Sequence, residues 1–283
     1  MAVARHGDGR AAVLRALASQ VHPVFMLPPI AASVFGGLVA GTFSTVAAGV
    51  HAVAIFAAVY TAHVKDGYVD FHRRGEDDDH PLTARGCRLA LVAATALHVT
   101  ALVGLWVIAG WGAVALTAPT WLIAYHHAPQ LDTNPIGATT GYPAGIALSV
   151  LGGFYVQAGT LAVEPVGFAA VFLVLLTGVK VIDDAQDYDY DRSIEKRTVA
   201  VVLGPARARR VAFGLMVAAL ALVGVLAALP VFPASAALAV VPFGAVAYVA
   251  RRADPELATM LLVRGAYLFL AVLVAAVWAR PIS

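Results

Sequence analysis

The chain has 283 residues, of which 60% are hydrophobic and only 13% are charged. A soluble domain of this length could not bury so much apolar surface, so the composition predicts a polytopic membrane protein. The formal net charge is +2 and the basic residues form no single block, which argues against a partner of the nucleic-acid class. The single cysteine, Cys87, excludes an internal disulfide.

The N-terminal segment, residues 1–20, is polar and carries Arg5, Arg10 and Arg15. No small-residue cleavage site follows the apolar run behind it, so we expect this segment to stay in the cytoplasm and not to be a removable signal peptide. We expect residues 1–283 to form a single domain.

A membrane-spanning helix needs about 20 mostly apolar residues. Nine stretches approach that length, approximately Val24 to Gly41, Val46 to Val64, Leu89 to Gly110, Ala113 to Tyr125, Tyr142 to Val163, Val166 to Ile182, Val211 to Leu229, Ala234 to Val249 and Met260 to Trp278. The fourth is short and contains Pro119. The sequence therefore predicts an all-α fold of about nine transmembrane helices, bundled around a central cavity.

Nine spans place the connections alternately on two sides of a membrane, and the basic residues sort with the sides. Almost all Lys and Arg residues fall on the side of the N-terminus, whereas the other side holds little besides Glu164 and Arg280. In membrane proteins the cytoplasmic loops carry the excess of Lys and Arg. We therefore expect an integral protein of the cell membrane with a cytoplasmic N-terminus and a C-terminus on the opposite side.

The most acidic stretch follows the sixth candidate span. Its five carboxylates fall within nine positions, at Asp183, Asp184, Asp187, Asp189 and Asp191. If the helix continues past Ile182, then Asp184, Asp187 and Asp191 project from one face. A hard divalent cation relieves the repulsion between them, and Mg²⁺ prefers a few carboxylates together with phosphate oxygens. The spacing predicts a metal site.

Phosphate donors follow this acidic stretch at Lys196, Arg197 and Thr198. Ammonium, guanidinium and hydroxyl groups are suited to phosphate oxygens. The alternative is a solvated acidic loop. The combination of helical spacing, a preceding apolar span and following cations favours a metal–diphosphate site.

A second acidic stretch follows the second candidate span. Asp66 and Asp70 are four residues apart, on one face of a helix end. Two acidic helix ends on one side of the membrane could face each other across a cavity. The run from Glu76 to Asp79 is either a solvated turn before Pro81 or part of the same site.

These motifs resemble those of the UbiA superfamily of intramembrane prenyltransferases, proteins of about nine helices with aspartate-rich motifs after the second and sixth spans. The second motif of that family is Asp-x-x-Asp-x-x-x-Asp, then Gly-Lys-Arg-Thr and an apolar stretch to Leu-Gly. It is matched by Asp184, Asp187, Asp191, Lys196, Arg197, Thr198, Leu203 and Gly204, with Glu195 in place of the glycine. With the topology, the resemblance extends over essentially the whole chain.

The first motif departs from the Asn-Asp-x-x-Asp pattern of the family. Asp66 replaces the asparagine, Gly67 replaces the second carboxylate, and Asp70 is kept. Arg74 stands where a further aspartate is expected, which leaves Glu76 or Asp77 to supply it. The family also has a basic residue after a tyrosine that follows the fourth span, but no Lys or Arg occurs between Tyr125 and Lys180.

The resemblance implies Mg²⁺-dependent transfer of an isoprenyl group from a polyprenyl diphosphate to a lipophilic acceptor, such as a quinone precursor or a lipid. It implies that Mg²⁺ holds the diphosphate to both motifs, with Asp66 and Asp70 sharing the first metal. The implied metal ligands are Asp66, Asp70, Asp77, Asp184, Asp187 and Asp191. The implied catalytic residues are Asp66, Asp70, Asp184, Asp187, Lys196 and Arg197. The implied substrate-binding residues are Lys65, Tyr68, Arg73, Tyr125, Tyr188 and Arg197.

Two other functions are compatible with these motifs. A membrane terpene cyclase of the same superfamily would ionise the same diphosphate but capture the cation internally. A divalent-cation transporter or non-catalytic membrane protein would use the acidic loops as ion sites, although a transporter is expected to carry carboxylates near the bilayer midplane. At this level the acceptor, the prenyl chain length and the oligomeric state stay open.

Overall fold

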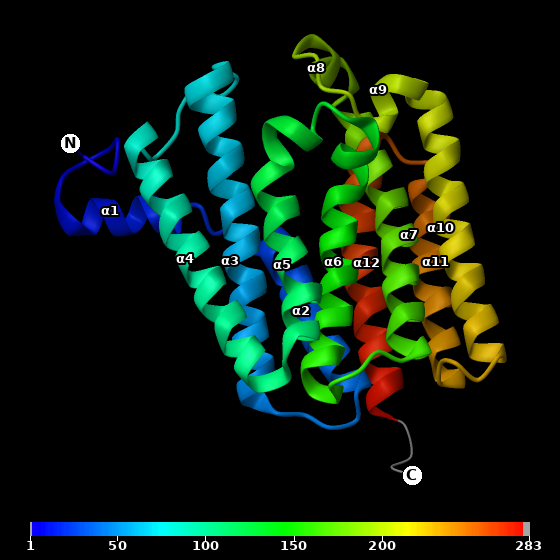
Figure 1. The fold of residues 1–283 in the computed structure, drawn as a ribbon. Helices are drawn as coiled ribbons and strands as arrows, with labels where there is room; N and C mark the ends of the chain where they lie inside the picture. The colour runs from blue at the N-terminus through cyan, green and yellow to red at the C-terminus, as the bar shows by residue number, and fades with distance from the viewer. Residues whose placement is uncertain (1, 280–283) are drawn as a thin grey trace.

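The computed structural model describes residues 2–279, which are helical apart from turns, loops and one isolated bridge between Ala4 and Leu82. The order is α1 (Gly9–Ala18), α2 (Pro23–Val39), α3 (Thr45–Val69), η1 (Asp70–Arg74), α4 (Ala84–Ala109), α5 (Trp111–His126), η2 (His127–Leu131), α6 (Pro135–Ala158), α7 (Val163–Gln186), α8 (Tyr188–Ser193), α9 (Val199–Leu203), α10 (Pro205–Ala228), η3 (Ala234–Ala239), α11 (Val240–Ala250) and α12 (Pro255–Trp278). The long helices lie side by side in one bundle (Figure 1).

Each of the nine predicted stretches forms a helix, at α2, α3, α4, α5, α6, α7, α10, η3 with α11, and α12. Within residues 2–279, five helices are long and apolar enough to cross a membrane: α3 continued by η1, α4, α7, α10 and α12. A sixth span arises if α1 and α2, which meet at a bend of 65°, count as one. The all-helical class is confirmed, and the count of nine spans stays a prediction.

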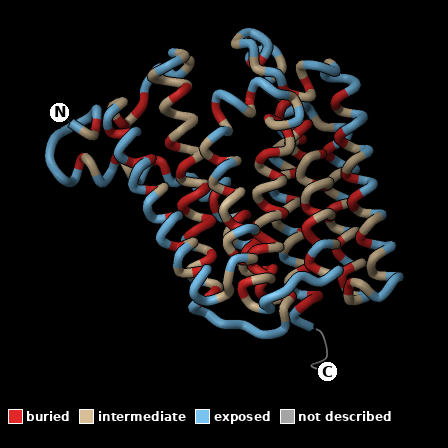
Figure 2. The backbone as a smooth tube through the Cα atoms, in the orientation of Figure 1, coloured by how far each residue is buried: buried red, intermediate tan, exposed pale blue. Residues whose placement is uncertain are grey.

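The outer face of the bundle is apolar. Large side chains such as Val92, Val107 and Val217 are exposed on α4 and α10, at 67%, 75% and 66% of their surface. The buried residues instead line the middle of the bundle (Figure 2). Exposed apolar surface on this scale needs a lipid or protein environment, so the structure supports an integral membrane protein.

Close packing between α2 and α6 forms the centre of the bundle. A Cβ atom on Gly36 would collide with the Val150 carbonyl, and one on Gly153 would collide with the Ser33 carbonyl. Small residues of this kind let membrane helices approach each other at the backbone. The ring of Phe35 packs edge-on against Phe168 beside this contact, with centroids 4.9 Å apart. The contact fixes the inner walls of the bundle.

Helix boundaries differ from the predicted ones where polar side chains set them. Helix α6 begins at Pro135 and not near Tyr142, because the Asn134 side chain accepts hydrogen bonds from the backbone N–H groups of Ile136 and Gly137. Helix α3 continues past Val64 into η1, and the chain leaves the helix only after Arg74. Asp66 and Asp70 therefore lie within the helical segment and not in the loop after it.

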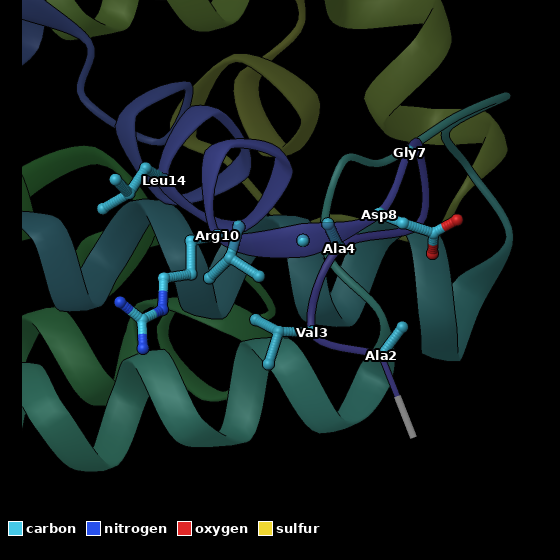
Figure 3. A pocket seen from close by; sticks show the side chains of 9 residues that line it. Ala2, Val3, Ala4, Gly7, Asp8, Arg10 and Leu14 are labelled. Carbon is cyan, nitrogen blue, oxygen red and sulfur yellow. The ribbon is translucent and has the colours of Figure 1, made fainter.

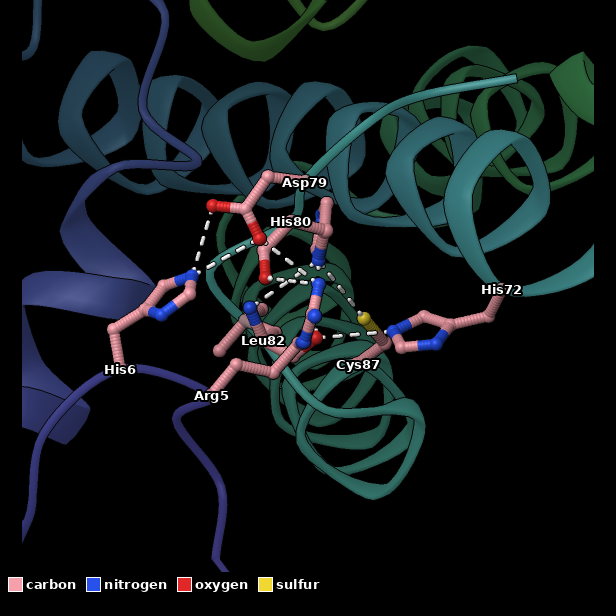
Figure 4. A network of polar contacts seen from close by, with 7 residues as sticks. All are labelled: Arg5, His6, His72, Asp79, His80, Leu82 and Cys87. Carbon is pink, nitrogen blue, oxygen red and sulfur yellow. Dashed lines mark hydrogen bonds and ion pairs between the residues drawn. The ribbon is translucent and has the colours of Figure 1, made fainter. Parts of the chain in front are cut away.

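The N-terminal segment docks on the loop that precedes α4. The backbone N–H of Arg5 donates to the Pro81 carbonyl at 2.9 Å, and the guanidinium of Arg5 bonds Asp79 at 2.9 Å. His6 also contacts Asp79, at 2.8 Å (Figure 4). Helix α1 then packs on α3, where the Tyr60 hydroxyl donates to the Leu17 carbonyl. This segment is therefore an ordered part of the fold as well as a polar one.

The run from Glu76 to Asp79 was predicted to be either a solvated turn or part of the acidic site, and its residues divide between these two roles. Asp79 binds the N-terminal segment, whereas Asp77 and Asp78 are exposed. Only the side chain of Glu76 turns inward, with 7% of its surface exposed. The part of the loop from Asp77 to Asp79 is therefore solvated or structural, and Glu76 alone faces the rest of the site.

Sidedness can be tested by cysteine labelling in a Cys87→Ala background, since Cys87 is the only cysteine. Asp78 follows α3 and Thr160 follows α6, and both are exposed. Three helices separate them, so we expect a membrane-impermeant maleimide to label Thr160→Cys but not Asp78→Cys in intact cells. Both should react after the membrane is permeabilised. Labelling of both positions in intact cells would mean that one of α4, α5 and α6 does not span.

Candidate functional site

The two aspartate motifs meet at one end of the bundle, the upper end in Figure 1. The first lies on the last turns of α3 and on η1, and the second on the end of α7 and on α8. Lys196, on the loop after α8, acts electrostatically on Asp66 and Asp70 and also on Asp187 and Asp191. One ammonium group thus lies within electrostatic range of both motifs, although the two motifs are far apart along the chain.

Asp184 is the most enclosed carboxylate of the second motif. It is 3% exposed, and both of its oxygens have partners. The Thr139 hydroxyl donates to Oδ2 at 2.8 Å, and the Lys180 ammonium lies 2.7 Å from Oδ1. Lys180 also bonds Asp183 at 2.7 Å, because residues three and four apart share a helix face. Sequence analysis missed Lys180, although a lysine inside an apolar run one turn before two carboxylates is a usable signal.

The rest of the second motif sits at a break in the helix. We expected one continuous helix through Asp191, but α7 ends at Gln186 and α8 begins at Tyr188. The Asp191 N–H still donates to the Asp187 carbonyl at 2.8 Å, which keeps the two residues one turn apart. Asp187 is exposed and Asp191 is buried. Burial raises the pKa of Asp191 to about 6, against the opposing effect of Lys196, so this carboxylate lacks sufficient positive charge nearby.

Arg74 occupies the middle of the first motif. Its Nη1 atom lies 2.7 Å from Asp132 Oδ2 and 3.5 Å from Asp70 Oδ1, and its Nε atom lies 3.6 Å from Glu76 Oε1. Asp132 follows η2 and is 6% exposed. Neither Arg74 nor Asp132 was predicted to be a site residue. Asp132 could have been singled out as the only acidic residue between residues 80 and 163.

Gly67, the position of the missing second carboxylate, is filled from outside by His80. A Cβ atom on Gly67 would collide with the His80 imidazole. His80 is 5% exposed, and burial lowers its pKa, so the neutral ring packs against α3. A side chain at position 67 would therefore require the buried ring of His80 to move.

Asp66 and Lys65 complete the first motif. Asp66 Oδ2 lies 3.9 Å from His127 Nε2, while Oδ1 is buried without a hydrogen-bond partner among residues 2–279. The Lys65 ammonium lies over the Tyr125 ring, 4.5 Å from its centroid. The structure thus places Lys65 beside Tyr125, and their role in substrate binding stays a prediction.

Tyr68, Arg73 and Asp77, three of the predicted site residues, lie away from the carboxylates described above. Tyr68 packs with the apolar cluster of α1 and α4, and Arg73 lies over its ring at 5.6 Å. Tyr68 is two residues after Asp66 on a helix, so its side chain points away from the face that carries Asp66. Asp77 is exposed, and Glu76 takes the inward position that we assigned to either of them. Tyr188 is half-buried in the first turn of α8, and Arg197 is exposed with its backbone N–H bonded to the Asp132 carbonyl.

A cavity of about 400 Å³ opens below the motifs, between α2, α3, α5, α6, α7 and α12. Its polar end is lined by His63, Asp66, His127, Lys180 and Asp183. Its other walls are mostly apolar and include Phe25, Tyr142, Phe172 and Tyr267. This size and lining suit a small-molecule ligand with one charged end.

A second hollow, of about 640 Å³, lies at the N-terminal segment (Figure 3). It is lined by residues from Ala2 to Leu14, and Asp8 and Arg10 are its charged side chains. It holds neither aspartate motif. The cavity below the motifs is therefore the candidate site.

No family model and no curated protein sequence matches this chain. Solved structures do match it. A digeranylgeranylglyceryl phosphate synthase superposes with a TM-score of 0.73 at 12% identity, over 94% of this chain and 98% of that one. A UbiA homologue from Aeropyrum pernix K1 gives 0.69 at 18% identity, over 90% and 98%. A UbiA homologue from Archaeoglobus fulgidus bound to GPP and Mg²⁺ gives 0.69 at 14% identity, over 95% and 100%. The resemblance predicted from the two motifs is confirmed at the level of the fold, which this chain shares with these solved structures.

Proposed function

We propose that this chain is a Mg²⁺-dependent intramembrane prenyltransferase that moves an isoprenyl group from a polyprenyl diphosphate to a lipophilic acceptor, such as a quinone precursor or a lipid. The observation that carries the proposal is the meeting of two aspartate motifs at the mouth of one apolar cavity. The matching Archaeoglobus fulgidus structures hold GPP or DMAPP together with Mg²⁺, which supports the same use of this fold here.

The residues of the second motif fit a magnesium ion. Asp184, Asp187 and Asp191 would supply hard oxygen ligands. Burial raises the pKa of Asp191 to about 6, and a bound cation would lower it. The buried, unpartnered Oδ1 of Asp66 is a further oxygen at the same mouth. Bound Mg²⁺ would offset the negative charge that diphosphate gains as the carbon–oxygen bond breaks.

Positively charged side chains of the protein would act on the same negative charge of the diphosphate. Lys196 lies within electrostatic range of both motifs and is the side chain best placed to bind the diphosphate. Preorganised positive groups lower a barrier when charge develops beside them. Lys180 has a positioning role, since it holds Asp183 and Asp184 at the wall of the cavity.

The cavity suits the isoprenyl group and the allylic cation that it forms. An allylic cation survives only where water is excluded, and aromatic faces attract positive charge. Phe25, Tyr142, Phe172 and Tyr267 line the space below the charged end. The isoprenyl chain would lie among these side chains with its diphosphate toward Lys196 and the aspartates.

We expect Asp184→Asn, Asp187→Asn and Asp191→Asn each to reduce turnover of geranylgeranyl diphosphate at least 100-fold, because each removes an oxygen ligand for Mg²⁺. The assay uses purified protein in detergent, labelled diphosphate, Mg²⁺ and a panel of acceptors. The mass of the product separates transfer from cyclisation, so a cyclase would be recognised in the same experiment.

Asp189→Asn is the matched control, since Asp189 is exposed on the same short helix as Asp191. It should keep turnover within about twofold of the parent protein. Near-normal turnover in two of the three motif variants would remove the second motif from the site.

Lys180→Met should destabilise the chain, because it leaves Asp183 and the buried Asp184 without their shared cation. Breaking a buried ion pair costs about 3 kcal/mol at the lower end of its range, so Tm in detergent without Mg²⁺ should fall by about 5–10 °C. The double variant Lys180→Met/Asp183→Asn removes one of the two unpaired charges and should recover part of this loss. An unchanged Tm in the single variant would show that the pairing does not hold the site together.

A further inference from the structure

Two departures from the family pattern meet in one ion pair of this structure. Arg74 stands where the resemblance expects a carboxylate, and the loop after α5 carries Asp132 but no basic residue up to Lys180. Arg74 Nη1 and Asp132 Oδ2 lie 2.7 Å apart although 58 positions separate the residues. The positive and negative partners have thus exchanged places between the first motif and this loop.

We propose that the Arg74 guanidinium takes the place of a metal ion at the first motif, so that this chain holds a diphosphate with one divalent cation instead of two. The inference rests on the proposed function and specifies how the same site binds its ligand. Arg74 is a fixed cation here, and the single Mg²⁺ belongs to the second motif together with Asp66.

The position of Arg74 among carboxylates carries the proposal. Its guanidinium contacts Asp70 on the same helical segment, Glu76 two residues further on, and Asp132 on the loop after α5. The side chains of Glu76 and Asp132 are only 7% and 9% exposed, so water screens these contacts weakly. A divalent cation bound by the same oxygens would have to sit beside a permanent positive charge.

The shortage of ligands supports the same conclusion independently. His80 fills the space that a side chain at position 67 would need, so the second carboxylate of the motif cannot return without moving a buried ring. Asp70 is already paired with Arg74. Asp66, Asp70 and Asp132 each keep a buried Oδ1 without a hydrogen-bond partner among residues 2–279. Asp70 and Asp132 lie beside Arg74, whereas Asp66 lines the cavity together with Asp183, next to the second motif.

Counting bound metal tests the proposal directly. Mn²⁺ replaces Mg²⁺, and geranylgeranyl thiolodiphosphate serves as an unreactive diphosphate on the full chain in detergent. Electron paramagnetic resonance then counts bound Mn²⁺ and detects coupling between neighbouring ions. We expect one uncoupled Mn²⁺ per chain. Two coupled ions in the parent protein would overturn the proposal without any variant.

The variant Arg74→Asp/Asp132→Lys reverses the ion pair and returns a carboxylate to the first motif. It should bind two Mn²⁺ ions with coupled spectra, whereas Arg74→Lys, which keeps the cation, should bind one. Arg85→Asp makes the same Arg-to-Asp substitution at an exposed position, without a compensating lysine, and should also bind one. A count of one in the reversed pair would show that Arg74 is not what excludes the second ion. If the reversed pair does not fold, the parent count still decides.

Failure of this inference can be told from failure of the proposed function. A chain that turns over prenyl diphosphate and binds two Mn²⁺ ions contradicts only the place given to Arg74. A chain that binds neither Mn²⁺ nor the thiolodiphosphate, and gives no product, contradicts the prenyltransferase proposal and this inference with it.

Discussion

Pairing of buried charge is the constraint on which the rest of the site depends. An apolar bundle with carboxylates at the ends of two helices is stable only if those carboxylates find cations or hydrogen-bond donors. Lys180 and Thr139 bind the two oxygens of Asp184, and Arg74 pairs with Asp132 and Asp70, each of which keeps a buried Oδ1 without a hydrogen-bond partner among residues 2–279. A divalent cation therefore has to share Asp184 with Lys180 and Thr139, and has to approach Asp70 beside Arg74. Structural pairing and metal binding are thus two uses of one set of charges.

The second motif could be predicted from the sequence because its geometry is local. Helical spacing places Asp184, Asp187 and Asp191 within two turns, and a break after Gln186 changes the details but not the grouping. The nine helical stretches were predictable for the same reason. Their number as spans was less so, since α2 and α5 have only 17 and 16 residues and η3 with α11 is a composite helix.

The first motif could be predicted only in part because its geometry depends on distant segments. Spacing places Asp66 and Asp70 on one face, but nothing in the spacing pairs Arg74 with Asp132. The choice between Glu76 and Asp77 depends on the turn at Gly75, whose φ of +68° ends the helix and directs the next side chain. Helix phase alone turns Tyr68 away from the face of Asp66. Arg73 follows Asp66 by seven residues, which is near the same face of a regular α-helix, but it lies in the π-helical segment η1, whose wider turn changes that phase.

The partners of Lys180 lie on its own helix, three and four residues away. Such a pair can form as soon as α7 is helical, so the helix can enter the bilayer with its lysine already neutralised. Arg74 also has a partner on its own helical segment, Asp70, but its shorter pair with Asp132 can form only after α5 has been inserted and the loop after it has brought Asp132 back to α3. During biosynthesis the second motif therefore matures within one segment, whereas the first is completed only by tertiary assembly of the bundle.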